Sequence, residues 1–169
     1  MTDQGRSPVA AVGFWSAVLG TIFSIAYDVG QLAEWMGLLG SGGGPENGST
    51  PFGLIVLLTP SLLLGSSFLV LMAAVHRLTP GARKMWSQIG LAFATAYAVL
   101  ISLVYFVQLT LVAPRMARGE VGGIELLVFV PFNSFLYAVD LLGYSFMSMA
   151  TLFVAFAFRG GGVEQVLYL

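Results

Sequence analysis

Two aspartates, Asp28 and Asp140, lie inside long apolar stretches of the sequence, over residues 9–33 and 132–158. An acidic side chain at the middle of a membrane helix costs about 2.5–3.5 kcal/mol, so it faces protein or water instead of lipid. Neither stretch contains a basic residue, and Arg115 is the cation that could snorkel toward the acids. Without such a partner, the two acids would share a proton or hold a cation. This behaviour is typical of a proton-coupled or cation-coupled site, and it equally suits a protonated acid that donates a structural hydrogen bond.

Four apolar blocks position these acids and predict an all-α membrane protein. The blocks cover residues 9–33, 53–76, 85–113 and 132–158. A hydrocarbon core about 30 Å thick needs around 20 apolar residues, because each helical residue rises about 1.5 Å. The chain is 57% hydrophobic and only 9% charged, against about 25% charged residues in soluble domains. We therefore expect a four-transmembrane-helix bundle in which residues 1–169 form a single integral membrane domain.

Glycine and proline divide the chain between the blocks. They dominate residues 40–52, which predicts a flexible loop before the second span. Residues 121–158 are apolar for too long a distance to make one straight crossing, and Pro131 divides them. We therefore expect a short interfacial or re-entrant segment from Gly122 to Val130, followed by the fourth span.

The basic residues predict which side of the membrane each loop faces. If both termini are cytoplasmic, the basic residues inside are Arg6, Arg77, Arg83, Lys84 and Arg159, and those outside are Arg115 and Arg118. This bias favours a cytoplasmic N-terminus and a cytoplasmic C-terminus. The compact chain without sorting signals suggests the cytoplasmic membrane of a bacterium.

Both ends of the chain leave alternatives open. The first block resembles a signal peptide, because Arg6 precedes it and residues 24–26 could form a small-residue cleavage site. Apolar residues continue past that site as far as Leu39, which favours a retained helix. Residues 163–169 are apolar as well, and they either lie on the membrane surface or lead into a longer parent chain.

The expected topology brings polar residues from all four spans to one depth near the outer face. Asp28 comes late in a span that runs outward, and Asp140 comes early in a span that runs inward. The residues expected to line this polar pocket are Asp28, Gln31, Thr59, Ser61, Tyr105, Gln108, Asn133, Tyr137, Asp140 and Tyr144. Membrane bundles also use Ser, Thr, Gln and Tyr for ordinary packing, through hydrogen bonds of about 0.6 kcal/mol each.

Several other residues are expected to have structural roles. Small residues recur on one face of three spans, which lets helices approach closely; examples are Gly13, Gly20 and Gly90. Glu34 lies nearer the outer interface than the aspartates and is expected to be solvated. His76 stands at the inner end of its span, where a lipid headgroup is the expected contact.

The residue inventory excludes several kinds of chemistry. There is no cysteine and one histidine, which excludes disulfides, thiolate metal sites and haem held by two histidines of one chain. No phosphate-binding glycine loop, nucleophile elbow or HExxH motif occurs. A net charge of −1 provides no basic patch for nucleic acid. We expect no catalytic group, cofactor or metal, and only the aspartate pair resembles part of a metal site.

Three functions remain, in order of preference. The first is a non-catalytic subunit, scaffold or assembly factor within the lipid bilayer, with a membrane-complex partner. The second is a small proton- or cation-coupled transporter or binding protein, with an outward-facing polar pocket around Asp28 and Asp140. Because four spans are few for a transporter, the second is expected to work as a homodimer. The third is an intramembrane enzyme that uses the two carboxylates as acid and base.

Overall fold

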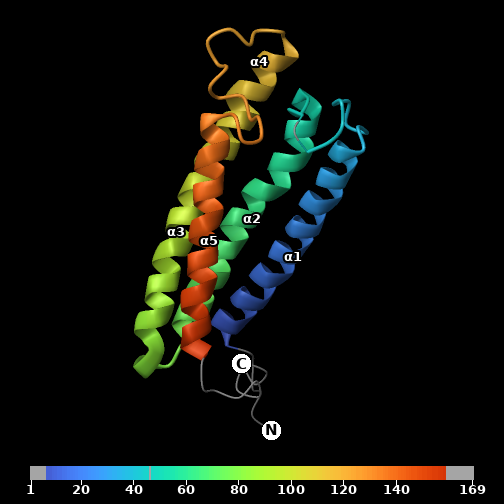
Figure 1. Ribbon diagram of the computed structural model, residues 1–169. Helices are drawn as coiled ribbons and strands as arrows, with labels where there is room; N and C mark the ends of the chain where they lie inside the picture. Colours follow the sequence, from blue (N-terminus) through green and yellow to red (C-terminus); the bar gives the residue numbers. More distant parts are fainter. Residues whose placement is uncertain (1–6, 46, 159–169) are drawn as a thin grey trace.

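The computed structural model describes residues 7–45 and 47–158, and these residues form helices, turns and loops but no strand. The elements in chain order are α1 (Pro8–Trp35), α2 (Pro51–Leu78), the 3₁₀ turn η1 (Gly81–Arg83), α3 (Lys84–Val107), the π-helical turn η2 (Gln108–Val112), α4 (Ala113–Ala117) and α5 (Phe135–Phe158) (Figure 1). The predictions for Arg6, Arg159 and residues 160–169 fall outside the described residues.

Four helical stretches within the described residues are long and apolar enough to cross a membrane. They are α1, α2, the run from Gly81 to Ala117, and α5. The predicted all-helical architecture is confirmed to this extent, and it is compatible with an integral membrane protein.

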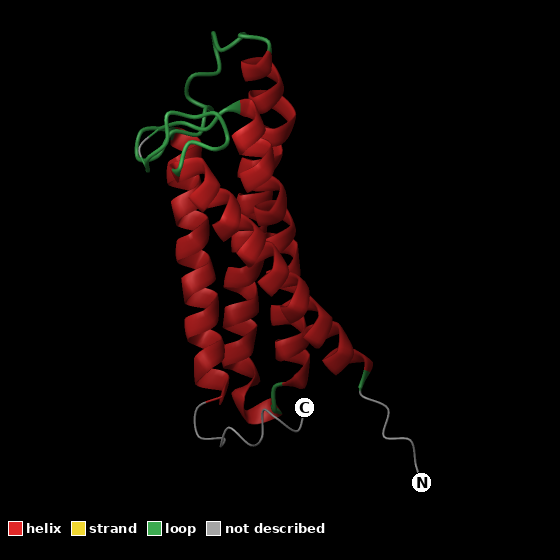
Figure 2. Ribbon diagram, turned by 90° about the vertical axis from the view of Figure 1, so that its right-hand side faces the viewer, coloured by secondary structure: helices red, strands yellow, loops and turns green. Residues whose placement is uncertain are grey.

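The four long helices pack in the order α1, α2, α3, α5, each against the next. Figures 1 and 2 show them extending along a common direction. The loop residues 36–45, 47–50 and 118–134 lie at one end of the bundle, which we call the loop end. The short connection between α2 and α3 lies at the opposite end, the turn end. α1 and α5 make no extensive contact, so the first and last of these helices do not close the bundle.

The buried core lies around α3, which packs against both α2 and α5. Tyr97, Ile101 and Val104 of α3 are 0% exposed. They form one cluster with buried leucines of α2 and with Leu136 of α5. By contrast, α1 exposes large apolar side chains such as Trp15, which is 62% exposed. A helix that is apolar on all faces but only partly buried is typical of a membrane span.

Small residues bring the helices close together. A Cβ atom added to Gly13 of α1 would lie 3.1 Å from the Cβ atom of Ala74 in α2. A Cβ atom added to Gly90 of α3 would lie 2.7 Å from a methyl group of Val154 and 2.9 Å from the backbone oxygen of Ala150, both in α5. No side chain fits at position 90 without separating these two helices.

The third span is longer and less regular than predicted. Its predicted end is residue 113, whereas the helix continues through η2 to Ala117. Pro114 explains the irregularity, because proline has no N–H and its ring clashes with the carbonyl group four residues earlier. The wider π turn of η2 accommodates the proline within a continuous helical run.

The fourth span begins at Phe135, later than the predicted start at residue 132. Phe132 has φ +62°, a left-handed conformation that is incompatible with a helix. Ser134 Oγ accepts hydrogen bonds from the N–H of Val130 at 3.2 Å and from the N–H of Tyr137 at 3.3 Å. The serine therefore caps the first turn of α5 and sets its starting residue.

The connection over residues 118–134 folds against the loop end of the bundle (Figure 1). Ile124 is buried, at 4% exposure, and the side-chain amide of Gln108 donates a hydrogen bond to the backbone oxygen of Leu127. The connection held by these contacts consists of turns and bends and contains no regular helix. An interfacial or re-entrant placement of Gly122 to Val130 stays a prediction.

We expect Gly90→Ala to lower the free energy of unfolding by about 1–3 kcal/mol, the usual cost of overpacking. Thermal unfolding of the purified protein in detergent measures the change. Gly20→Ala is the matched control, because its added Cβ would lie no closer than 3.8 Å to a neighbour and alanine favours a helix. Equal stability of the two variants would contradict the close packing of α3 on α5.

Candidate functional site

A glycine-dependent cap ends α1 and fixes the position of Glu34. Gly37 has φ +75°. Its N–H donates to the backbone oxygen of Glu34 at 2.9 Å, and the N–H of Leu38 donates to the backbone oxygen of Ala33 at 2.9 Å. This pair of bonds is a Schellman motif, which favours glycine because the residue after the helix end is left-handed. Glu34 is thereby held in the last turn of α1.

A cleft of about 470 Å³ lies at the loop end, and side chains from α1, α2, α3 and α5 line it. The structure brings Asp28 and Asp140 to this cleft. The predicted pocket residues that line it are Asp28, Gln31, Tyr105, Tyr137, Asp140 and Tyr144. Lining residues outside the prediction include Tyr27, Glu34, Trp35, Asn47, Leu54, Leu57, Leu58, Phe129 and Phe132.

Two predicted pocket residues of α2 lie away from the cleft. Thr59 is exposed on the surface of the bundle. Ser61 is 1% exposed, and its hydroxyl donates to the backbone oxygen of Leu57 at 2.9 Å. The face of α2 that lines the cleft carries Leu54, Leu57 and Leu58. At about 100° per residue, Thr59 turns away from this face and Ser61 follows it one turn deeper in the core.

Gln108 and Asn133 also lie outside the cleft, contrary to the prediction. Gln108 is 0% exposed, and its side-chain amide donates a hydrogen bond to the backbone oxygen of Leu127. Asn133 is exposed in the turn before α5, because that helix begins later than predicted. Gln108 therefore anchors a loop, and Tyr105 is the residue that α3 contributes to the cleft.

Asp28 and Asp140 line the cleft in different environments. Asp28 is exposed, whereas Asp140 is only 6% exposed. The Tyr105 hydroxyl lies beside the Asp140 carboxyl and shares a hydrogen bond of 3.1 Å with the Tyr144 hydroxyl. Asp140 Oδ1 has no hydrogen-bond partner among the described residues. A buried carboxyl with an unpaired oxygen is uncommon in proteins and needs an explanation.

Glu34 lies in a different environment from the one expected. The sequence predicts a solvated side chain, but Glu34 is 3% exposed. Neither of its carboxyl oxygens has a partner within the described part of the chain. Glu34 lines the cleft beside the first turn of α2, where a Cβ atom added to Gly53 would lie 2.7 Å from Oε2. The carboxyl therefore occupies space that only a glycine at position 53 leaves open.

The surrounding backbone compensates only in part for the burial of Glu34. The C-terminal end of α1 disfavours a negative charge, and the neighbouring first turn of α2 favours one, by about 0.3–1 kcal/mol in each case. A buried acceptor without a partner costs about 1–3 kcal/mol, and a charged one more. The N–H of Gly53 already donates to Thr50 Oγ1 at 3.0 Å. A positively charged donor would therefore lower the free energy of this site.

Aromatic side chains form much of the cleft wall. The ring of Tyr137 lies 5.3 Å from that of Phe129 and 5.2 Å from that of Phe132. On the opposite wall, the Tyr27 hydroxyl donates to Gln31 Oε1 at 3.1 Å. The cleft therefore combines acidic groups with ring surfaces, and ring faces attract cations.

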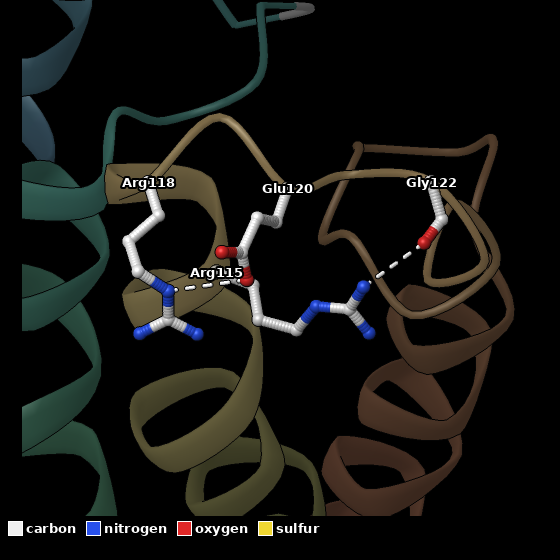
Figure 3. Close-up of polar contacts among 4 residues, drawn as sticks. All are labelled: Arg115, Arg118, Glu120 and Gly122. Carbon is white, nitrogen blue, oxygen red and sulfur yellow. Dashed lines mark hydrogen bonds and ion pairs between the residues drawn. The ribbon is translucent and has the colours of Figure 1, made fainter.

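The basic side chains near the loop end contact groups outside the cleft. Arg118 forms an ion pair of 3.1 Å with Glu120, and Arg115 donates to the backbone oxygen of Gly122 at 3.1 Å (Figure 3). Arg115 therefore does not supply the ion pair that snorkelling would provide. None of the described residues that line the cleft is Lys, Arg or His.

The acids of the cleft do not form a three-residue metal site. Over residues 7–45 and 47–158, no group of three His, Cys, Asp or Glu side chains could hold a metal ion. His76 is far along α2 at the turn end, where Nδ1 shares a hydrogen bond of 3.0 Å with Ser87 Oγ. The three carboxyls of the cleft therefore do not form a metal site of this kind.

Comparison with models of known protein families, with curated proteins and with solved structures found no match to this chain. The assignment of a function therefore rests on the chemistry of the cleft.

We expect Glu34→Leu to raise the free energy of unfolding by about 1–3 kcal/mol, because it removes buried oxygens that no described group satisfies. Thermal unfolding in detergent measures the change. Glu120→Leu is the control; Glu120 is exposed in its ion pair with Arg118, so its replacement should change stability by less than about 0.5 kcal/mol. Loss of stability in Glu34→Leu would show that the carboxyl supports the fold.

Proposed function

We propose that this protein is a small proton- or cation-coupled transporter or binding protein of a membrane. In this proposal α1, α2, α3 and α5 cross a bacterial cytoplasmic membrane, both termini are cytoplasmic, and the cleft opens toward the outer side. The apolar surfaces of the helices support membrane insertion. The bias of the basic residues toward the turn end supports the orientation.

The observation that carries the proposal is the uncompensated acidity of the cleft. Asp28, Glu34 and Asp140 line it, and no basic residue does so among those described. Both oxygens of Glu34 and one oxygen of Asp140 are buried without a partner in the described structure. Electrostatic attraction is stronger in such a poorly hydrated site than in water. A cation is the ligand that best matches these groups.

A bound cation should stabilise the folded protein, and Asp140→Asn should remove that stabilisation. Asparagine keeps the shape of the side chain but carries no charge. The purified protein in detergent is unfolded thermally in Na⁺, K⁺ and ethylammonium chloride at equal ionic strength, and over a range from acidic to neutral pH. At a hundredfold excess of ligand over its Kd, the expected stabilisation is about 2.7 kcal/mol.

Two further variants make this experiment specific. Asp28→Asn should weaken the same stabilisation, because Asp28 lines the cleft. Thr59→Val should retain it, because Thr59 is exposed outside the cleft. If wild type and Asp140→Asn respond identically to every cation and to pH, the proposed function is wrong. Uptake of the stabilising cation into proteoliposomes then distinguishes a transporter from a binding protein.

A non-catalytic subunit or assembly factor is the second candidate function. The observation that favours it is the packing of α1, which contacts α2 but exposes many large apolar side chains on its other faces. Such a surface can contact a second membrane helix as readily as lipid. Recovery of a stoichiometric partner after purification in a mild detergent would support this function, and a homo-oligomer alone would contradict it.

A further inference from the structure

We infer that the ligand of this cleft is an organic ammonium ion with N–H donors and a compact aromatic or apolar body, and that Glu34 anchors its nitrogen. This inference rests on the proposed cation-binding function and specifies its substrate class. The unpartnered oxygens, the lining of the cleft and the lack of a three-residue metal site among the described residues support it independently of one another.

The oxygens of Glu34 require hydrogen-bond donors as well as positive charge. Both are buried and unpaired with respect to the described residues, and a carboxylate offers about four lone-pair sites. An ammonium group with N–H bonds supplies charge-assisted hydrogen bonds, which are roughly twice as strong as neutral ones. A quaternary ammonium supplies charge without a donor. A primary or secondary amine in its protonated form therefore fits this site better.

The remainder of the cleft suits an apolar body attached to the nitrogen. Its lining includes the rings of Trp35, Phe132 and Tyr137 together with Leu54 and Leu57 of α2. Its volume of about 470 Å³ lies within the range of about 300–1,000 Å³ that is usual for sites of small organic ligands. An inorganic ion would leave most of this apolar lining without a contact.

The positions of the acids also favour an ammonium over a metal ion. No three acidic or histidine side chains in the described residues could share one metal ion, whereas Ca²⁺ takes about six to eight oxygen ligands around one point. An ammonium needs only one close carboxylate. Asp28 and Asp140, which also line the cleft, then contribute to attraction of the ligand.

In the inferred complex, Glu34 reaches the ligand by rotation of its side chain. The residue lines the cleft, while Oε2 lies against the backbone of Gly53. The side chain has staggered alternatives at its torsions, and position 53 has no side chain that would hold the carboxyl in place. After this rotation the Glu34 carboxyl contacts the nitrogen of the ligand instead of the backbone of Gly53. The Schellman motif keeps the backbone of Glu34 fixed.

Isothermal titration calorimetry with phenethylammonium and the full chain in detergent tests the inference. We expect saturable binding to the wild type and at least about tenfold weaker binding to Glu34→Gln, because a charged hydrogen-bond partner is lost. Glu120→Gln should keep the wild-type affinity, because Glu120 pairs with Arg118 outside the cleft. Phenethyl alcohol, which lacks the charge, and ethylammonium, which lacks the ring, should each bind at least about tenfold more weakly.

Each part of the inference has an outcome that overturns it. Equal affinity of wild type and Glu34→Gln overturns the role of Glu34, and equal affinity for phenethylammonium and phenethyl alcohol overturns recognition of charge. Should Glu34→Gln fail to fold, Glu34→Leu serves in its place. We expect the same loss of affinity for phenethylammonium, and retained affinity again overturns the role of Glu34. Asp140-dependent stabilisation by Na⁺ or K⁺ without phenethylammonium binding overturns the organic ligand but leaves the proposed function standing. Absence of binding by every cation overturns the inference, and it overturns the proposed function as well if wild type and Asp140→Asn also respond identically to pH.

Discussion

The burial of carboxyl oxygens without a partner is the constraint on which the chemistry of this protein depends. Glu34 is 3% exposed and Asp140 is 6% exposed, yet three of their oxygens are unpaired in the described structure. Proteins rarely keep such groups inside a fold, since each one costs about 1–3 kcal/mol. A positively charged ligand is the simplest compensation, because no basic side chain lines the cleft among the described residues.

The architecture creates this constraint by separating the first and last helices. α1 packs on α2, and α5 packs on α3, so the acids of α1 and α5 line a cleft instead of a closed interface. Gly53 leaves room for the Glu34 carboxyl. Phe132 is left-handed at the rim of the cleft, a conformation that costs about 1–3 kcal/mol in a residue other than glycine. Backbone strain of this kind is often found at functional sites.

The sequence indicates the helices of this protein better than it indicates the site. Apolar blocks reveal the four potential spans, and the rarity of acids within these blocks is enough to single out Asp28 and Asp140. For Glu34 the expectation of solvation is wrong, because its burial depends on Gly53, a residue distant in sequence. For Asn133 the expectation of a helical position is wrong, because hydrophobicity does not reveal the left-handed turn at Phe132. Contacts across loops and backbone conformations of single residues set both features.

Carboxyl modification by an apolar carbodiimide, located by mass spectrometry of peptides, tests most directly whether a cation occupies the acidic cleft. The rates at Glu34, Asp140 and Glu120 are compared with and without saturating phenethylammonium. We predict that the ammonium slows modification of Glu34 and Asp140 together and leaves Glu120 unchanged, because Glu120 lies outside the cleft in an ion pair with Arg118. Unchanged rates at Glu34 and Asp140, or equal slowing at all three residues, would contradict the cleft as a site for an organic ammonium ion.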